Sequence, residues 1–369
     1  MDACILSMQS VNNMGSLLQA YVLKKLLESM DIRVSFLDIK KIDEDYSLLG
    51  DFRLPFNLEN EKRGKLGKIS KIDKYIINRI ENKFITKEQE AIFENFRRTY
   101  LEIYKVREKY DLCVIGSDEV FNCLNAGSWG FTSQLFGNVP EAKKVITYAA
   151  SCGATTYEKL PDKVVAKIIE VFKDVSGFSV RDKNTKNFVS RLTNRKITEN
   201  LDPVLIYDFD NEIEGIKLSK LPSKYCVIYS YGNRIHDMNE RNSIMSFCKR
   251  HEMIPVAIGA PQFWCKDYIA CSPFECLKIF QNAEHIITDT FHGTIFSVKY
   301  AKKFAVLTRE SNKNKMIDLV TRLNVTDHVI EDCSMLESNY SIKKNEQSIQ
   351  RILETEKDKT INYLKNSVH

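Results

Sequence analysis

The fold class is decided by residues 3–38, which read ACILSMQSVNNMGSLLQAYVLKKLLESMDIRVSFLD. An apolar run at 3–8 leads into a polar turn that contains Gly15, and apolar residues then recur at helical spacing. A second apolar run covers 33–38. A strand, a helix and a strand in this order form a βαβ unit, which predicts a parallel sheet.

The same alternation continues through the rest of the chain. Most of the later strand candidates are separated by helical patterns, and they cover 112–115, 144–149, 177–180, 225–229, 254–258, 285–288 and 304–307. Such an alternation predicts a doubly wound α/β architecture, in which ligands bind beyond the carboxyl ends of the strands.

The length of 369 residues exceeds what one hydrophobic core usually fills, so we expect two domains. The least sheet-like stretch between strand candidates is 207–224, which carries acidic residues, Gly215 and Pro222. The predicted organisation is an amino-terminal domain at 1–206, a linker at 207–224, a carboxyl-terminal domain at 225–342 and a final helix at 343–369.

Composition excludes several classes of function. The net charge of +5 is small for this length and no nucleic-acid-binding signature accompanies it, so we expect no nucleic-acid partner. The amino terminus does not have the pattern of a signal peptide, and no apolar run reaches the roughly 20 residues that span a bilayer. The ten cysteines lie partly in apolar strand-like runs and do not have zinc-site spacing. We therefore expect a cytoplasmic protein with no metal site and, at most, peripheral membrane contact.

A basic segment at 62–87 has apolar residues three or four apart, which predicts an amphipathic helix with a basic face. Two interpretations remain open. The helix packs on its domain and its basic face is solvated, or it docks on an anionic membrane surface.

Four motifs place polar residues at the ends of predicted strands. In the first, 11–19, Gly15 precedes a helix whose free amides suit an anion. The alternative is that Asn13 or Ser16 only caps this helix.

The second motif, 111–121, places Gly116 and Ser117 at a strand end and Asp118 just beyond it. A carboxylate there can orient a sugar hydroxyl or accept its proton. Alternatively, Asp118 is a helix cap.

In the third motif, 177–182, a strand delivers Arg181 at its end. The guanidinium group is a planar fork of donors that suits a phosphate or a carboxylate. The alternative is an ion pair with Asp182 or with another surface carboxylate.

The fourth motif is the most informative. Residues 286–294 read IITDTFHGT, a strand that ends in polar residues and continues into a helix. His292 stands at the helix amino terminus, where an anionic group could meet an imidazole able to transfer a proton. The remaining internal histidines lack such surroundings and are interpreted as structural or surface residues: His236, His251, His285 and His328.

In this order, the motifs resemble the polysaccharide pyruvyl transferase family. The matching pieces span most of residues 1–330, and they are 13–21, 115–118, 148–153, 179–182, 201–203 and 289–294. Three positions depart from the family pattern: Thr290 replaces a more usual serine, and Glu119 and Phe121 replace glutamine and tryptophan. These departures leave the details of the acceptor pocket open.

The resemblance implies two Rossmann-like domains facing across a cleft, similar to B-type glycosyltransferases. It also implies a reaction in which phosphoenolpyruvate is the donor substrate and its carbon skeleton becomes a cyclic ketal on two hydroxyls of a sugar, which could be lipid-linked. No cofactor is implied. Such chemistry needs a proton donor, cations for the phosphate and carboxylate, and a group that positions the hydroxyl.

The motifs offer candidates for each role. We expect His292 to be the general acid or to hold the departing phosphate, Arg181 to bind the phosphate or carboxylate, and Asp118 to orient the acceptor. The other expected substrate-binding residues are Asn13, Gly15, Ser16, Ser117, Asp289, Thr290, Gly293 and Thr294. Two other functions stay open: a glycosyltransferase that uses a nucleotide sugar, and a non-catalytic scaffold of glycan assembly.

Overall fold

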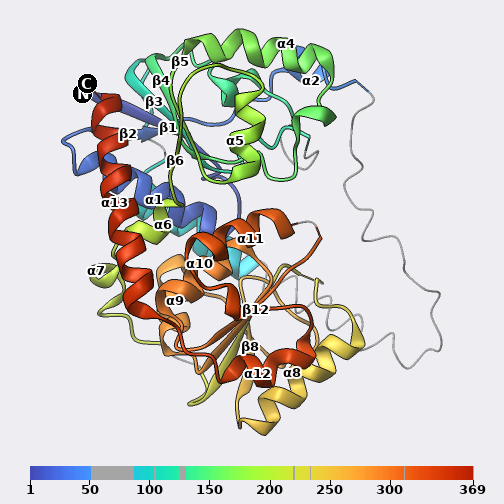
Figure 1. Ribbon diagram of the computed structural model, residues 1–369. Coiled ribbons are helices and arrows are strands. Elements are labelled where there is room, and N and C mark those ends of the chain that lie inside the picture. Colours follow the sequence, from blue (N-terminus) through green and yellow to red (C-terminus); the bar gives the residue numbers. More distant parts are fainter. Residues whose placement is uncertain are drawn as a thin grey trace.

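The computed structural model describes residues 1–50, 87–103, 105–124, 130–218, 221–232, 234–310 and 312–368. Its strands form two six-stranded sheets, one in each half of the molecule (Figure 1). Every described pair of neighbouring strands is parallel. The predicted α/β fold of two Rossmann-like domains is therefore confirmed.

The first sheet has the order β2-β1-β3-β4-β5-β6. Its strands are β1 (Asp2–Leu6), β2 (Arg33–Phe36), β3 (Tyr110–Asp118), β4 (Ala142–Ala150), β5 (Val175–Val180) and β6 (Ile197–Glu199). The middle strands carry nearly continuous apolar runs because helices cover both faces of the sheet.

The second sheet has the order β12-β11-β10-β7-β8-β9. Its strands are β7 (Tyr225–Tyr229), β8 (Ile254–Ile258), β9 (Asp267–Ile269), β10 (His285–Thr288), β11 (Phe304–Leu307) and β12 (Val329–Ile330). All nine predicted strands are present. The sequence did not predict β6, β9 and β12, which are edge strands of two or three residues with too little apolar sequence to form a pattern.

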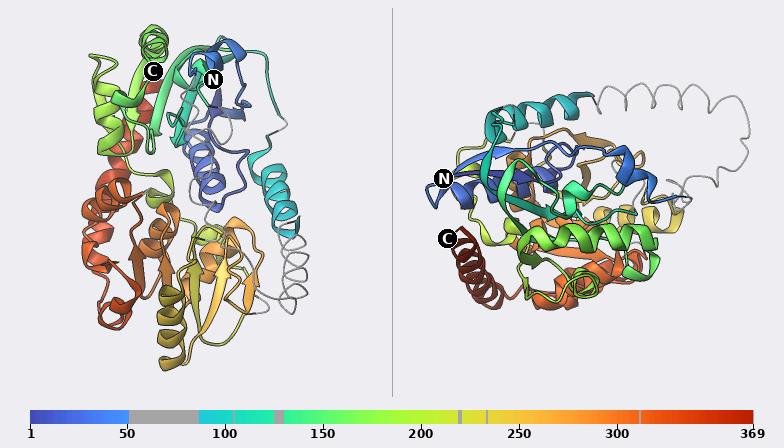
Figure 2. Two further views of the ribbon diagram at one scale, coloured as in Figure 1. Left: turned by 90° about the vertical axis from the view of Figure 1, so that its right-hand side faces the viewer. Right: turned by 90° about the horizontal axis from the view of Figure 1, so that it is seen from above.

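Helices cover both sheets and also lie between the domains (Figures 1 and 2). Residues 87–96 are helical and continue into the π-helical turn η2 (Arg97–Leu101). The α-helices are α1 (Met14–Glu28), α2 (Asp43–Ser47), α4 (Asp162–Val171), α5 (Lys183–Ser190), α6 (Pro203–Ile206), α7 (Asp210–Ile213), α8 (Met238–Arg250), α9 (Pro273–Asn282), α10 (Phe291–Tyr300), α11 (Lys313–Arg322), α12 (Leu336–Tyr340) and α13 (Glu346–Val368).

Helix α1 is buried on almost all sides. Thirteen of its 15 residues are buried, and the apolar ones among them belong to a hydrophobic core that includes residues of both domains. A helix that is apolar around most of its circumference belongs inside a protein. The two domains therefore share one core beside α1, while two separate cores cover the outer faces of the sheets.

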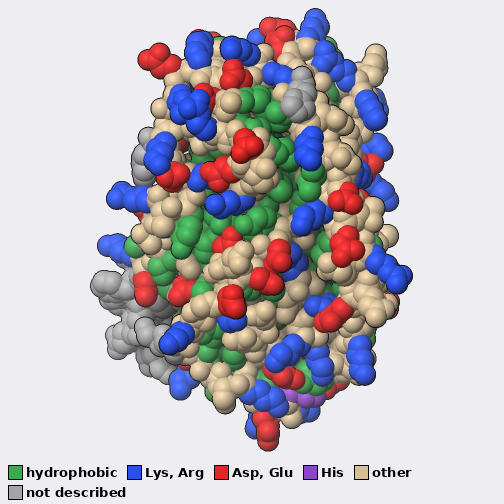
Figure 3. Space-filling model, turned by 90° about the vertical axis from the view of Figure 1, so that its left-hand side faces the viewer, with side chains coloured by type: hydrophobic (Ala, Val, Ile, Leu, Met, Phe, Trp, Pro, Cys, Tyr) green, Lys and Arg blue, Asp and Glu red, His purple; other side chains and the backbone are tan. Residues whose placement is uncertain are grey.

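The last helix, α13, returns from the second domain to the first (Figure 1). Tyr363 Oη donates to the carbonyl of Thr147 at 2.8 Å, and Asn200 Nδ2 donates to Thr360 Oγ1 at 3.2 Å. On the face that carries α13, hydrophobic side chains gather among charged ones (Figure 3). The helix thus connects the end of the chain to the first sheet.

The predicted amphipathic helix at 62–87 lies outside the described residues, apart from Lys87. Within the described part of the chain, no helix has the length and apolar character that crossing a bilayer requires. The ten cysteines form no disulfide, and nine of them are buried.

Candidate active site

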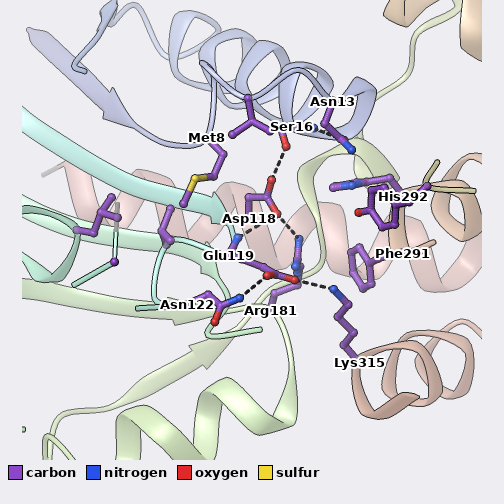
Figure 4. A pocket seen from close by; sticks show the side chains of 15 residues that line it. Met8, Asn13, Ser16, Asp118, Glu119, Asn122, Arg181, Phe291, His292 and Lys315 are labelled. Atoms are coloured by element: carbon purple, nitrogen blue, oxygen red, sulfur yellow. Dashed lines mark hydrogen bonds and ion pairs between the residues drawn. The ribbon is translucent and has the colours of Figure 1, made fainter. Parts of the chain in front are cut away.

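Each of the two sheets has a point at which the order of its strands reverses, and the site lies at these points. The strand order reverses between β1 and β3 in the first sheet, and between β10 and β7 in the second. Ligands of open parallel sheets bind beyond the strand ends at such points. A cavity of roughly 270 Å³ lies there, between the domains (Figure 4). It is lined by Met8, Val11, Asn13, Ser16, Asp118, Glu119, Val120, Asn122, Gly130, Leu135, Arg181, Tyr231, Phe291, His292 and Lys315.

His292 meets the first domain through Gly15. A Cβ atom added to Gly15 would lie 2.0 Å from Cγ of the imidazole, which is far inside a van der Waals contact. Glycine is therefore required for α1 to approach the ring this closely. The His292 side chain is 8% exposed, and its Nε2 has no hydrogen-bond partner among the described residues.

A fully buried carboxylate, Asp202, joins three elements at the back of the cavity. Its Oδ2 accepts from Gln19 Nε2 of α1 and from Arg181 Nη1 at 3.2 Å. His292 Nε2 lies 3.7 Å from the same oxygen. Asp202 also caps α6, because its Oδ1 accepts from the amide of Val204 at 3.1 Å. The carboxylate thus holds the guanidinium by a hydrogen bond and lies near the imidazole.

Asp118 lies at the cavity wall, at the end of β3. Ser16 Oγ donates to its Oδ2 at 2.6 Å, and the amide of Glu119 donates to its Oδ1 at 2.9 Å. Arg181 Nη1 lies 3.8 Å from Oδ1. Asp118 has a φ of 82°, which a non-glycine residue adopts only when its surroundings hold it there. These contacts fix the carboxylate at the cavity wall (Figure 4).

A second charged group lies at the side of the cavity. Lys315 Nζ of α11 pairs with Glu119 Oε1 at 2.6 Å, and Asn122 Nδ2 donates to Glu119 Oε2 at 2.7 Å. Burial opposes ionisation of Glu119, but the charge and hydrogen bond of Lys315 and the charge of Arg181 outweigh it and lower its pKa to about 2. Glu119 is therefore an anion at any physiological pH.

Both cations of the cavity, Arg181 and Lys315, lie near the ring of Phe291. Arg181 Cζ lies 4.1 Å from the ring centroid and Lys315 Nζ lies 5.9 Å from it. Arg181 is 3% exposed, and its Nε has no hydrogen-bond partner among the described residues. A buried guanidinium with a free donor suits an oxyanion.

Burial lowers the pKa of His292 below its ordinary value. Asp118 and Asp202 raise this pKa, whereas Arg181 and Lys315 lower it further. The imidazole is therefore neutral at neutral pH while the cavity is empty. An anion bound beside it would raise its pKa and favour the protonated form.

A second cavity of roughly 230 Å³ adjoins the first on the other side of His292. The two share Val11, Asn13, Tyr231 and His292. The remaining lining residues are Asn12, Met14, Phe93, Tyr229, Ser230, Gly259, Ala260 and Thr290. None of the described lining residues is Lys, Arg, Asp or Glu, so the second cavity is aromatic and neutral where the first is charged.

Asn13 caps α1, as the alternative interpretation of the first motif proposed. Its Oδ1 accepts from the amides of Gly15 at 2.8 Å and Ser16 at 3.3 Å. The two amides that an anion would use are therefore already engaged. Asn13 and Ser16 still contribute side chains to the cavity wall.

The start of α10 is organised by Thr290. Its Oγ1 accepts from the amide of Gly293 at 2.9 Å, and its carbonyl accepts from the amide and hydroxyl of Thr294 at 3.0 Å. A Cβ on Gly293 would lie 2.1 Å from Thr288 Oγ1. Gly293 and Thr294 thus hold the helix start in place and line neither cavity, whereas Thr290 lines the second.

Asp289 and Ser117 also lie outside both cavities. Asp289 Oδ2 accepts from Arg309 Nε at 3.0 Å, which ties the end of β10 to the chain after β11. The carbonyl of Ser117 accepts from Ser7 Oγ at 3.1 Å, which connects β3 to the end of β1. Both residues support the loops that carry the cavity.

Five of the predicted site residues therefore line the first cavity together: Asn13, Ser16, Asp118, Arg181 and His292. Sequence reasoning did not assign roles to Asp202 and Lys315. Asp202 had a signal, because an aspartate before Pro203 is typical of a helix start at a strand end. Lys315 had no signal, since it is one of several lysines around a surface helix.

In the described residues, no group of three or more His, Cys, Asp or Glu has the arrangement of a metal site. Among the described lining residues of the first cavity, Arg181 and Lys315 are the arginine and the lysine.

Solved structures with a similar fold include an epimerase and a glycosyltransferase. The UDP-GlcNAc 2-epimerase of Methanocaldococcus jannaschii, solved with UDP-GlcNAc and UDP, is similar with a TM-score of 0.50 and 12% identity over 96% of this chain and 99% of its own. The Streptomyces sp. SF2575 glycosyltransferase SsfS6 has a TM-score of 0.42 and 11% identity over 98% of this chain and 96% of its own. At such identity the likeness to the epimerase shows the fold alone.

No curated protein sequence matches the chain. The family model described as polysaccharide pyruvyl transferase matches residues 13–311, which include the first cavity's residues from Asn13 up to and including His292. The chain belongs to the polysaccharide pyruvyl transferase family.

Proposed function

We propose that the protein transfers the pyruvyl group of phosphoenolpyruvate to a sugar and forms a cyclic pyruvate ketal in the synthesis of a surface polysaccharide. The observation that carries the proposal is the first cavity. It combines two buried nitrogens without partners among the described residues, Arg181 Nε and His292 Nε2, with a fixed carboxylate, Asp118. Family membership supports the same reaction.

The chemistry needs few protein groups. The methylene carbon of the donor takes up one proton, its C2 forms two bonds to sugar oxygens, and the bond from C2 to the phosphate oxygen breaks. Of the two hydroxyl protons, one ends on the new methyl group and the other leaves with phosphate.

The described residues match these steps. Arg181, which lines the cavity, binds the phosphate or carboxylate of the donor with its guanidinium group. The bound anion raises the pKa of His292, so the imidazolium protonates the methylene carbon or stabilises the departing phosphate. Asp118, fixed by Ser16, accepts a hydrogen bond from the attacking hydroxyl and orients it.

The acceptor sugar occupies the second cavity. Its wall combines Phe93, Tyr229 and Tyr231 with amide and hydroxyl groups, and a neutral pyranose presents one apolar face and several hydroxyls to such a wall. His292 borders both cavities, so it would stand between donor and acceptor.

Calorimetric titration tests the donor. Phosphoenolpyruvate is expected to bind the parent and to lose at least about tenfold in affinity in Arg181→Ala, because a charged hydrogen bond is removed. Arg191→Ala is the matched control, since Arg191 is an exposed arginine at the end of α5.

A panel of UDP-, GDP- and CMP-sugars is titrated in parallel. Binding of a nucleotide sugar without binding of phosphoenolpyruvate would contradict the proposal and favour a glycosyltransferase. Absence of binding by both classes would favour a scaffold role.

A further inference from the structure

Lys315 is the one residue of α11 that reaches the first cavity among the residues the structure describes. Its side chain is 20% exposed and extends across the domain boundary toward Glu119 of the first domain (Figure 4). Part of the Lys315 side chain is therefore open to the surroundings of the cavity.

The other cation of the cavity is less available. Arg181 lies near two carboxylates, Asp202 at 3.2 Å and Asp118 at 3.8 Å, and it stacks on the ring of Phe291. Its guanidinium is almost fully buried and fixed in orientation. Its Nε is buried, and its charge is already compensated by the two carboxylates.

Glu119 places a permanent negative charge on the same wall. Its low pKa keeps it ionised, and Asn122 holds its second oxygen. An unpaired carboxylate in this position would repel an anionic ligand. Its pairing with Lys315 cancels this repulsion only as long as the lysine stays with Glu119.

We propose that Lys315 is a second anion-binding residue of the cavity, and that Glu119 holds it in the empty site and releases it to the phosphate or carboxylate of the ligand. The inference rests on the proposed donor, which carries two anionic groups. A lysine suits this exchange because its flexible stem lets one ammonium group reach either partner.

A purely structural interpretation makes a different prediction. The pair connects α11 to the first domain, so it could serve only as an interdomain tie. However, α11 has another such tie, since Arg322 Nη1 donates to the carbonyl of Arg181 at 2.7 Å. If the pair were only a tie, removal of either partner would have the same effect on ligand affinity.

The exchange predicts opposite effects for the two partners. Lys315→Gln removes a charged contact, so phosphoenolpyruvate is expected to bind at least about tenfold more weakly. Glu119→Gln removes both the competitor and the repulsion, so the same ligand is expected to bind roughly threefold more tightly. Lys315→Arg should keep most of the affinity, because it keeps the charge.

Titration calorimetry with phosphoenolpyruvate, and separately with inorganic phosphate, measures these changes in the full chain. Lys313→Gln is the matched control, because Lys313 is an exposed lysine on the same helix that pairs with Glu310. Circular dichroism and thermal unfolding confirm that each variant is folded.

The outcomes separate this inference from the proposed donor. If the parent binds phosphoenolpyruvate and Lys315→Gln binds it equally well, the inference is wrong and the donor stands. Weaker binding by both Lys315→Gln and Glu119→Gln would identify the pair as an interdomain tie and would also overturn the inference. Binding of phosphate alone, dependent on Lys315, would support the anion site and contradict the donor, whereas binding of neither ligand would contradict both.

Discussion

The two domains meet along two contact regions of opposite character. In the apolar region, Tyr21 of α1 and Phe274 of α9 pack with ring centroids 5.1 Å apart, and Phe96 lies 5.1 Å from the same Phe274 ring. In the polar region, Asp202 joins Arg181 and His292, and Glu119 pairs with Lys315.

This difference indicates that the two regions have different roles. The apolar region buries aromatic surface and should supply most of the free energy that holds the domains together. The polar region keeps unpartnered and charged groups in place, which costs stability but provides binding chemistry. Substitutions in the apolar region should therefore change stability with little effect on ligand affinity. Substitutions in the polar region should change ligand affinity with little effect on stability.

The largest expected effect is on stability in the apolar region. Phe274→Ala should lower the free energy of unfolding by about 3–5 kcal/mol, because it leaves a cavity among four other rings. Chemical denaturation measures this loss. Phe263→Ala is the control, since Phe263 is 56% exposed, and a comparable loss there would contradict the argument.

The next effect occurs where the two regions join, at Gly15. Gly15→Ala places a methyl group inside the His292 ring, so we expect a loss of about 1–3 kcal/mol in unfolding free energy together with weaker ligand binding. Gly215→Ala is the matched control, because no atom lies within 4 Å of its added Cβ. Equal effects of the two substitutions would show that the close approach to His292 is unimportant.

A smaller effect concerns pH in the polar region. Burial lowers the pKa of His292 in the empty cavity, and a bound anion raises it, so binding takes up a proton. Affinity for phosphoenolpyruvate should therefore increase as pH falls from about 8 to about 6.5, by less than tenfold per pH unit.

Calorimetry in buffers of different ionisation enthalpy measures the proton uptake. The proton uptake that is due to the imidazole should disappear in His292→Gln, because a glutamine side chain does not titrate. Uptake that stays the same in this variant would assign the proton to another group.

The smallest effect tests a polar contact inside the apolar region. Tyr21 Oη and Tyr207 Oη each donate to Glu212 Oε1 at 2.7 Å. Tyr21→Phe should cost about 1 kcal/mol of unfolding free energy and leave ligand affinity unchanged, because the ring contacts remain. A change in affinity would show that the two regions are coupled.

The strands and the loops at their ends could be predicted from local patterns. Nine apolar runs defined nine strands, and the polar residues that follow three of these runs are Asp118, Arg181 and His292. The pattern was sufficient because parallel strands place their carboxyl ends at one edge of a sheet, so sequence position alone locates these residues. Short edge strands such as β12 were not predicted, because two residues form no pattern.

The network around these residues could not be predicted in the same way. From the sequence, Asp289 was expected at the site and Asp202 was assigned no role, yet Asp289 pairs with Arg309 outside the cavity while Asp202 lies close to both Arg181 and His292. The direction of each carboxylate depends on which helix packs beside it, and that helix comes from another part of the chain.

The sequence by itself therefore determined the fold class, the family resemblance and the strand-end residues, because each depends on local periodicity or on an ordered set of short motifs. Only the tertiary structure decided that Gly15 lies against His292, that Asp202 holds Arg181, and that Lys315 of one domain meets Glu119 of the other. The physical reason is that these contacts join segments far apart in the chain, and the packing of the two domains around α1 sets their distances.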